Sequence, residues 1–263
     1  MMGKLARIWI GATRLELSDE LSYRFNFILK TITHTLTSAI IPLITLLVYT
    51  VSSGIPGWSL EEFLLLNGSF MFIGGLGSTL FQSMTWRTID KIWHGRYDMD
   101  LIRPVRPLVL ATLNTFNPDG LAYIFVGASI MAVSLVKMHW VFNAISTLSF
   151  VLLVGLALLF FYSIDIITIA LSFLFVKTFA LANAVEEIIN IGKYPLSIYG
   201  STGMVLFTFL FPVGLAGFYP AQALLGKLSF LMIGKLALVA FAFFGFSLLL
   251  WSVWMKKYSS AGG

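Results

Sequence analysis

The fold of this chain is decided by long apolar runs such as Leu148-Ser-Phe-Val-Leu-Leu-Val-Gly-Leu-Ala-Leu-Leu-Phe-Phe-Tyr162, which carries no charged residue. Of the 263 residues, 58% are hydrophobic and 11% are charged, against about 25% charged in an average soluble domain. The mean hydropathy is +0.91. A membrane-spanning helix needs about 20 predominantly apolar residues, and several such stretches follow one another. The sequence therefore predicts an all-α integral membrane protein.

Six transmembrane helices are predicted from the positions of these stretches. We place them at residues 27–52, 60–84, 118–136, 140–162, 165–185 and 229–253. The fourth and fifth are separated only by a tight turn near Tyr162, Ser163 and Asp165, because the stretch is long enough for two crossings but leaves almost no loop. A further apolar segment, 203–224, is rich in proline and glycine, which favours a re-entrant hairpin before the last span. Counting this segment as a seventh span is the alternative.

The basic residues predict which way the chain faces. Lys and Arg concentrate in cytoplasmic loops, and an even number of spans places both termini on one side. With six spans, most of the 17 basic residues fall on that side. They are Lys4, Arg7, Arg14, Arg24, Lys30, Arg87, Lys91, Arg96, Arg103, Arg106, Lys256 and Lys257. We therefore expect a multi-pass protein of the cell membrane with cytoplasmic N- and C-termini, and the net charge of +5 reflects topology rather than nucleic-acid binding.

The two ends of the chain are expected to lie outside the spanning domain. Residues 1–26 are predicted to form an amphipathic interfacial helix, because residues 4–23 mix Leu, Ile and Trp with charges. A plain solvated lead-in is the alternative. This stretch lacks the apolar core and small-residue cleavage site of a signal peptide, so no removal is expected. Residues 27–257 then form the six-span domain, and residues 258–263 form a C-terminal tail.

Several chemistries are excluded or disfavoured by the residues present. The chain has no cysteine, which excludes disulfides, thiolate metal ligands and cysteine nucleophiles. His34, His94 and His139 lie too far apart in sequence to suggest a metal site, and we expect no catalytic residue, metal or cofactor in this chain. The phosphate-binding loop G-x-x-x-x-G-K-[ST] is absent. The chain therefore cannot drive an ATP-dependent process by itself.

The most informative polar stretch is 86–107, which follows the second span and is far longer than a turn needs. It reads Trp86-Arg-Thr-Ile-Asp-Lys-Ile-Trp-His-Gly-Arg-Tyr-Asp-Met-Asp-Leu-Ile-Arg-Pro-Val-Arg-Pro107. Basic, acidic and apolar side chains are mixed along it, which favours a surface that binds a partner. A plain topology signal is the alternative. Gly95 interrupts the stretch, and Pro104 and Pro107 end it because they lack backbone donors.

Five stretches are informative as an ordered set: Tyr23-Arg-Phe-Asn-Phe27, Gly57-Trp-Ser-Leu-Glu-Glu-Phe-Leu-Leu-Leu-Asn-Gly68, Gly95-Arg-Tyr-Asp-Met-Asp-Leu-Ile-Arg-Pro-Val-Arg-Pro-Leu108, Lys193-Tyr-Pro-Leu-Ser-Ile-Tyr199 and Phe211-Pro-Val-Gly-Leu-Ala-Gly-Phe-Tyr-Pro-Ala221. In this order they resemble the permeases of ABC-2-type exporters, in the subfamily that pairs two different six-span permeases with a separate ATPase. The resemblance covers nearly the whole chain. It departs in the fifth predicted span, where family members often carry a Phe-Trp pair and this chain has Phe175-Val-Lys177.

The resemblance implies a transport subunit, not an enzyme, of an ATP-driven exporter in the lipid bilayer. ATP and Mg would be bound by two copies of a partner ATPase. A second permease, a different chain or else a second copy of this one, would complete the route. Residues 86–107 would include a cytoplasmic coupling helix that docks on the ATPase. The implied coupling residues are Arg87, Asp90, Lys91, Trp93, Arg96, Asp98, Asp100, Arg103 and Arg106.

Charges inside a membrane are functional candidates by default. We expect Lys177 of the fifth span and Asp165 at the inner turn to line the translocation route, together with Pro212 and Pro220 of the hairpin. For Lys177, snorkelling to an interface is the alternative.

Two other functions remain as alternatives. An ATP-independent carrier or channel often has paired, interrupted half-repeats, whereas this chain has one interrupted hairpin. A membrane-embedded enzyme would need acids, bases or metal ligands that converge on one site.

Overall fold

A computed structural model describes residues 7, 9–11, 13–15, 18, 22, 24–52, 54–113, 115–175 and 178–258. Over these residues the chain is helical and contains no strand. The longer helices are α2 (Arg24–Val51), α3 (Leu60–Gly77), α4 (Ser83–Trp93), α7 (Gly120–Lys137), α8 (Ala144–Ser172), α9 (Phe179–Asn190) and α12 (Phe230–Trp254). The short ones are α5 (Asp98–Leu101), α6 (Pro107–Leu113), α10 (Gly200–Val205) and α11 (Phe218–Leu224).

Helix starts are encoded by polar caps in the loops. Before α3, the Ser59 hydroxyl accepts from the Glu62 N–H at 3.2 Å, and the Glu62 carboxylate accepts from the Ser59 N–H at 3.3 Å, which is a complete capping box. Before α8, Asn143 Oδ1 accepts from the N–H groups of Ile145 and Ser146. These caps set the residues at which α3 and α8 begin.

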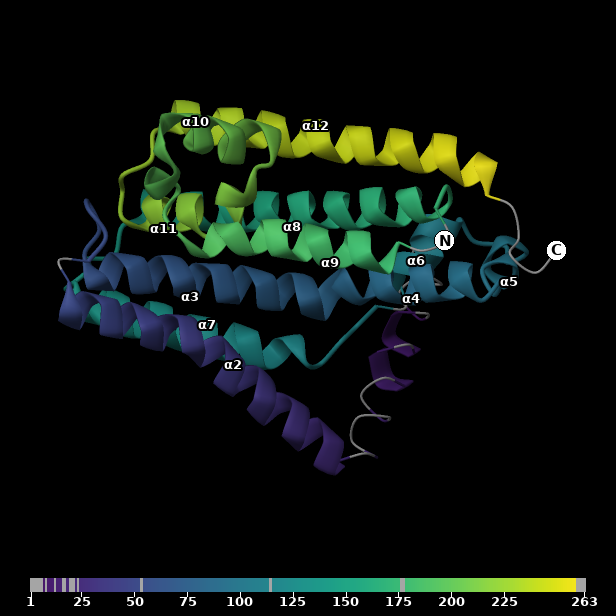
Figure 1. The fold of residues 1–263 in the computed structure, drawn as a ribbon, viewed down its shortest axis with the longest axis horizontal. Coiled ribbons are helices and arrows are strands. Elements are labelled where there is room, and N and C mark those ends of the chain that lie inside the picture. Colours follow the sequence, from purple (N-terminus) through teal and green to yellow (C-terminus); the bar gives the residue numbers. More distant parts are fainter. Residues whose placement is uncertain are drawn as a thin grey trace.

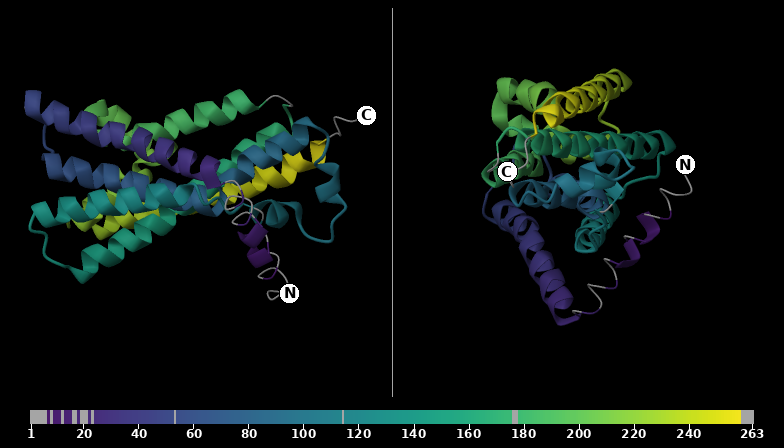
Figure 2. Two further views of the ribbon diagram at one scale, coloured as in Figure 1. Left: turned by 90° about the horizontal axis from the view of Figure 1, so that it is seen from below. Right: turned by 90° about the vertical axis from the view of Figure 1, so that its right-hand side faces the viewer.

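The helices α3, α4, α7, α8 and α12 run lengthwise along one axis, with α12 along one side and α7 along the other, whereas α2 slants away from the bundle toward its N-terminal end (Figure 1). Helices α10 and α11 gather at one end of the bundle, and α4, α5, α6 and the C-terminal end of α12 gather at the opposite end. Figure 2 shows the same lengthwise arrangement from below and from the end. We call the end with α5 the connector end and the other the hairpin end.

Within the described residues, four helical stretches are long and apolar enough to cross a membrane: Leu60–Trp93, Gly120–Lys137, Ala144–Ser172 and Phe230–Lys257. They confirm the predicted spans at 60–84, 118–136 and 229–253. The predicted span at 60–84 is longer in the structure, because α3 continues into α4 through the π-helix Ser78–Gln82 without a break. The helix α2, of 28 residues, covers most of the first predicted span, 27–52.

The tight turn predicted near Tyr162, Ser163 and Asp165 is wrong, because α8 runs through this point unbroken. Its polar side chains find partners without interrupting the helix. The Ser163 hydroxyl donates to the Leu159 carbonyl at 2.6 Å, and the Tyr162 hydroxyl lies 2.7 Å from the Thr112 hydroxyl. The chain leaves the helix later, after Ser172, and α9 begins at Phe179 and runs in the opposite direction (Figure 1).

Close packing of α3 on α7 is permitted by glycines on both helices. A Cβ on Gly75 would lie 2.7 Å from the backbone nitrogen of Ile124, and a Cβ on Gly127 would lie 2.5 Å from that of Phe72. Small residues let backbones approach in this way inside membranes. Large apolar side chains instead point outward, such as Leu148 of α8 and Leu238 of α12, which are more than 70% exposed. An apolar exterior of this kind matches a lipid environment.

Candidate functional site: the connector end and the cavity above it

The predicted coupling stretch contains the end of α4, the short helix α5 and the start of α6. The chain leaves α4 after Trp93, and Gly95 has a φ of +65°, a conformation that glycine adopts without strain. We call residues 94–106 the connector. Pro107 begins α6, where a missing N–H costs nothing. The interruption at Gly95 is therefore a sharp turn between α4 and α5.

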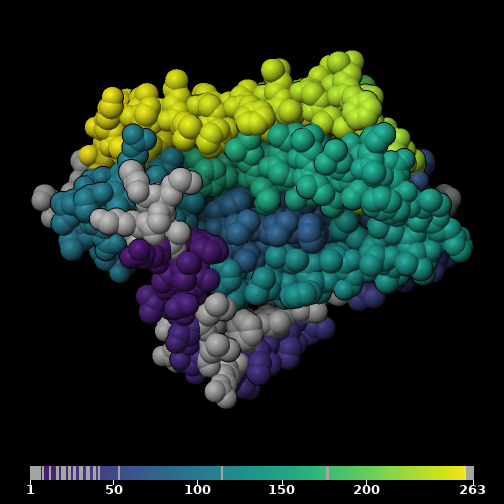
Figure 3. Space-filling model, turned by 180° about the vertical axis from the view of Figure 1, so that it is seen from behind, coloured from purple at the N-terminus to yellow at the C-terminus, as the bar shows by residue number. Residues whose placement is uncertain are grey.

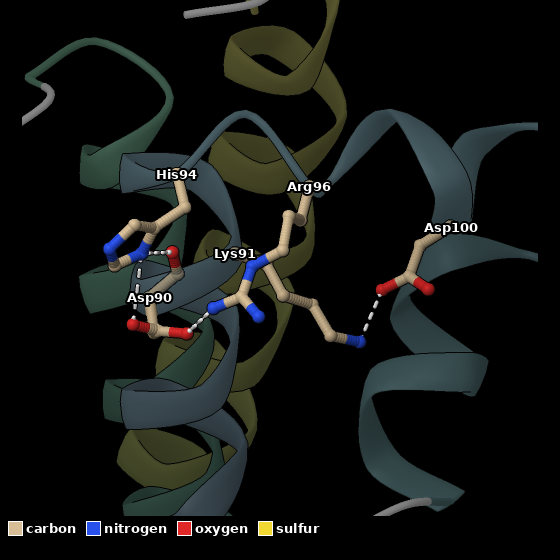
Figure 4. A network of polar contacts seen from close by, with 5 residues as sticks. All are labelled: Asp90, Lys91, His94, Arg96 and Asp100. Carbon is tan, nitrogen blue, oxygen red and sulfur yellow. Dashed lines mark hydrogen bonds and ion pairs between the residues drawn. The ribbon is translucent and has the colours of Figure 1, made fainter.

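Ion pairs fold the connector back on α4 (Figure 4). The Lys91 ammonium lies 2.6 Å from the Asp100 carboxylate, which is buried at 6% exposure. The Arg96 guanidinium contacts Asp90 at 2.5 Å, and His94 Nδ1 lies 3.1 Å from the same carboxylate. Because Arg96 and Asp90 are both largely exposed, their pair contributes about 1 kcal/mol or less. The buried Asp100 is the more important anchor.

Beyond these pairs the connector presents an exposed surface of mixed character. Met99 is 61% exposed and Ile102 is 77% exposed, and Leu101 and Trp93 are exposed as well. Exposed basic residues accompany them. This docking surface, as we define it, consists of the exposed connector residues Arg96, Met99, Leu101, Ile102, Arg103 and Arg106, together with Trp93 at the end of α4. Exposed apolar side chains bordered by charge are typical of a protein-binding site.

Tyr97 is the most deeply buried side chain of the connector, with only 1% of it exposed. Its ring centroid lies 5.3 Å from that of Phe173 at the end of α8 and 5.4 Å from that of Tyr258, beyond the end of α12. Phe173 in turn lies 5.2 Å from Trp251 of α12. We call Phe173, Trp251 and Tyr258 the aromatic socket. Burial raises the pKa of Tyr97 above its ordinary value, so this hydroxyl stays neutral.

Next to the connector end, a cavity of about 580 Å³ lies between α3, α4, α7, α8 and α9. Its wall combines aromatic rings with polar side chains, a mixture that suits a ligand site. The polar lining residues are Ser78, Gln82, Ser83, Arg87, Asn117, Tyr123, Asp165, Glu186 and Asn190. The aromatic ones include Phe70, Phe81, Trp86 and Phe161.

Two carboxylates from neighbouring helices face this cavity. Asp165 of α8 accepts a hydrogen bond of 2.7 Å from the Thr85 hydroxyl of α4, and Glu186 of α9 accepts one of 3.2 Å from the Trp86 indole. Trp86 also stacks on Phe179 at 6.1 Å. The cavity wall is therefore tied to α4, the helix that continues into the connector.

The π-helix Ser78–Gln82 forms part of the same wall. Its wider turn redirects carbonyls, and the segment before α7 binds them. The Thr115 hydroxyl donates to the Leu80 carbonyl at 2.7 Å, and the Asn117 N–H donates to the Thr79 carbonyl at 3.1 Å. Single π turns of this kind recur at functional sites. Sequence reasoning missed this feature, since no residue pattern marks it.

The predicted route residues are not brought together. Asp165 lines the cavity. Pro212 and Pro220 are buried at the hairpin end instead, where α11 packs against α3 and α8. Lys177, most of the interfacial helix predicted at 4–23 and the tail beyond Tyr258 lie outside the described residues. Glu186 and Thr85, by contrast, were not predicted as cavity residues.

At the hairpin end, loop residues contact the ends of helices α3 and α11. The Lys227 ammonium lies 2.5 Å from Glu62, and the Trp140 indole donates to the Leu224 carbonyl at 2.9 Å. Of the predicted hairpin 203–224, the residues of α11 are mostly buried. From the side opposite Figure 1, the surface is hollowed between α7 and α8, with α3 as its floor (Figure 3).

These features define a multi-pass helical membrane protein with a polar cavity and an exposed connector at one end. The profile of the ABC-2 family transporter proteins matches residues 35–262, and the chain belongs to this family. It is therefore a membrane component of a transporter, in a family whose members generally work with an ABC ATPase. No curated protein and no solved structure matches the chain significantly.

Proposed function

We propose that the chain is the permease subunit of an ATP-driven ABC exporter, forming part of the translocation route and coupling to a separate ATPase. The family match over residues 35–262 carries this proposal. The chain has no phosphate-binding loop of its own, so ATP and Mg belong to the partner. An ATP-independent carrier or channel is the alternative.

The proposed topology has six crossings with both termini in the cytoplasm. Five of the proposed crossings are α2, α3–α4, α7, α8 and α12. The sixth is α9, which runs from the connector end toward the hairpin end (Figure 1). Tyr258 touches Tyr97, so the C-terminal basic pair Lys256–Lys257 lies at the same end as the basic connector. The positive-inside rule makes this end cytoplasmic.

Affinity purification of the chain from its native membrane tests the proposal most directly. We expect two copies of a Walker-motif ATPase and a second permease to remain bound, and the complex to hydrolyse ATP. A preparation that binds no ATPase, after cross-linking has excluded loss of subunits in detergent, would move the function to a carrier or channel.

Charge reversal on the connector tests the docking surface. The variant Arg96→Glu/Arg103→Glu is expected to weaken ATPase binding by about tenfold or more. Charges across an interface are complementary, and reversing two of them replaces attraction by repulsion. Both side chains are more than half exposed, so the membrane part should stay folded. The measured quantity is the ATPase retained in co-purification.

Lys137→Glu is the matched control, because Lys137 is an exposed basic residue at the end of α7 toward the hairpin end. It should leave ATPase retention unchanged. Equal retention by the connector variant and the control would contradict docking at this surface.

The cavity is the part of this chain that we assign to the translocation route. Asp165 and Glu186 place two carboxyl groups in a setting where charge is costly unless it serves a function. The native chain has no cysteine. A single Gln82→Cys variant therefore reports access to the cavity through its reaction with a water-soluble maleimide.

We expect the labelling rate at position 82 to change by about fivefold or more between the nucleotide-free complex and the complex trapped with ATP and vanadate, a coupling of ordinary allosteric size. Ser52→Cys, in the exposed loop between α2 and α3, is the control and should react equally in both states. An unchanged rate at position 82 would exclude the cavity from the transport cycle.

A further inference from the structure

We propose that Tyr97 is the positioning residue through which movement of the connector reaches α8 and α12. This inference rests on the proposed function, because it assumes that an ATPase acts on the docking surface. It adds which helices receive the motion and which side chain delivers it.

The first step concerns how the connector is attached to the bundle. The Lys91–Asp100 and Arg96–Asp90 pairs join the connector to α4, the helix from which it emerges. They therefore fold it locally. Among the described residues, Tyr97 is the one side chain of the connector that belongs to the apolar cluster at this end, together with Ile166, Ile169 and Phe173 of α8 and Trp251 of α12. Contacts from the connector to these two helices thus converge on one ring.

The second step concerns the strength and shape of that contact. The Tyr97 ring lies tilted against Phe173 at 49° and edge-on to Tyr258 at 78°. Aromatic pairs prefer such offset and edge-to-face arrangements. A ring with 1% exposure, held from two sides, cannot shift without moving the walls of its socket, because packed interiors do not deform continuously.

The third step leads from the socket to the cavity. Ile166 and Ile169 pack in the same cluster as Tyr97, and Asp165, next to Ile166, lines the cavity. Asp165 lies eight residues, or about 12 Å along the helix axis, before Phe173, the residue that caps the C-terminal end of the unbroken helix α8. A displacement of the socket end of α8 therefore reaches the carboxylate that faces the cavity.

The Tyr97 hydroxyl shows whether the contact with the aromatic socket is made by the ring or by a polar bond. It is buried and has no hydrogen-bond partner among the described residues. The contact with the socket is thus made by the ring and not by a polar bond. Tyr97→Phe keeps the ring and should behave like the native chain, whereas Tyr97→Ala empties the socket.

The test uses the complex of the full chain with its ATPase, carrying the Gln82→Cys reporter. With Tyr97→Ala we expect normal ATPase retention and ATP hydrolysis, but a labelling rate at position 82 that no longer differs between the nucleotide-free and vanadate-trapped states. Tyr97→Phe should restore the difference. Tyr194→Ala, an exposed tyrosine toward the hairpin end, is the matched control.

A second variant guards against misfolding of Tyr97→Ala. Tyr258→Ala removes the socket wall contributed beyond α12, near the end of the chain, and should reduce the labelling difference in the same direction. The proposal is overturned if Tyr97→Ala and Tyr258→Ala both keep the full difference, if Tyr97→Ala loses the ATPase, or if Tyr97→Phe fails like the alanine variant. Failure of the proposed function looks different, because the native chain itself would then hold no ATPase.

Discussion

Replacing Gly75 by alanine is expected to destabilise the protein by about 1–3 kcal/mol or more, the usual cost of overpacking a close contact. An added Cβ would lie 2.7 Å from the Ile124 nitrogen and 2.9 Å from the Gly120 carbonyl oxygen. Both are backbone atoms of α7, so no side-chain rotation can relieve the clash. Helices α3 and α7 would have to separate. Thermal unfolding of the purified protein in lipid nanodiscs measures the loss.

The neighbouring glycine provides the matched control. Gly74 precedes Gly75 on the same helix, and a Cβ there meets nothing within 4 Å. Gly74→Ala should be neutral or slightly stabilising, because alanine is favoured over glycine inside a helix by up to about 1 kcal/mol. Equal destabilisation by the two substitutions would show that the α3–α7 contact does not depend on a missing side chain.

The spans that sequence reasoning located well are those bounded by capping residues and loops. Ser59 and Ser229 each precede an apolar run and accept a backbone N–H of the following helix, so the starts of α3 and α12 were predictable. The turn predicted at Tyr162 to Asp165 is wrong because it rested only on the length of the apolar stretch, which was divided into two crossings, whereas α8 runs on to Ser172. In the structure the side chains of Ser163, Asp165 and Tyr162 have partners within α8, on α4 and on α6, and such pairings between distant segments cannot be read from spacing.

The connector could be predicted from sequence, and the cavity could not. Gly95, Pro104 and Pro107 mark local breaks, which depend on backbone chemistry alone. The cavity instead depends on the break between α8 and α9, which brings Glu186 beside Asp165 on the neighbouring helix. The predicted fifth span, 165–185, instead puts Asp165 at the start and Glu186 just after the end of one helix, which separates the two carboxyl groups by the length of that helix. The π-helix at Ser78–Gln82 has no recognised sequence signal either.

The contact between Thr85 and Asp165 gives the second large effect. Thr85 is buried at 4% exposure and donates to Asp165 at 2.7 Å. Thr85→Val removes the donor and leaves a carboxyl group at the cavity wall without this bond, which is expected to cost about 1–3 kcal/mol. The measurement is again thermal unfolding in nanodiscs. Thr168→Val is the matched control, since the buried Thr168 hydroxyl donates to the Ile164 carbonyl of its own helix at 2.9 Å.

A double-mutant cycle then distinguishes a structural pair from a functional one. Replacing both partners, with Thr85→Val and Asp165→Leu, should cost less than the sum of the single changes, because no polar group is left unpaired; the interaction energy is expected at about 0.5–3 kcal/mol. Strictly additive losses would contradict the contact. If the double variant is stable but its position-82 labelling no longer responds to nucleotide, the carboxylate serves transport. If the response is retained, the pair holds α4 to α8 and the route depends on the rest of the cavity wall.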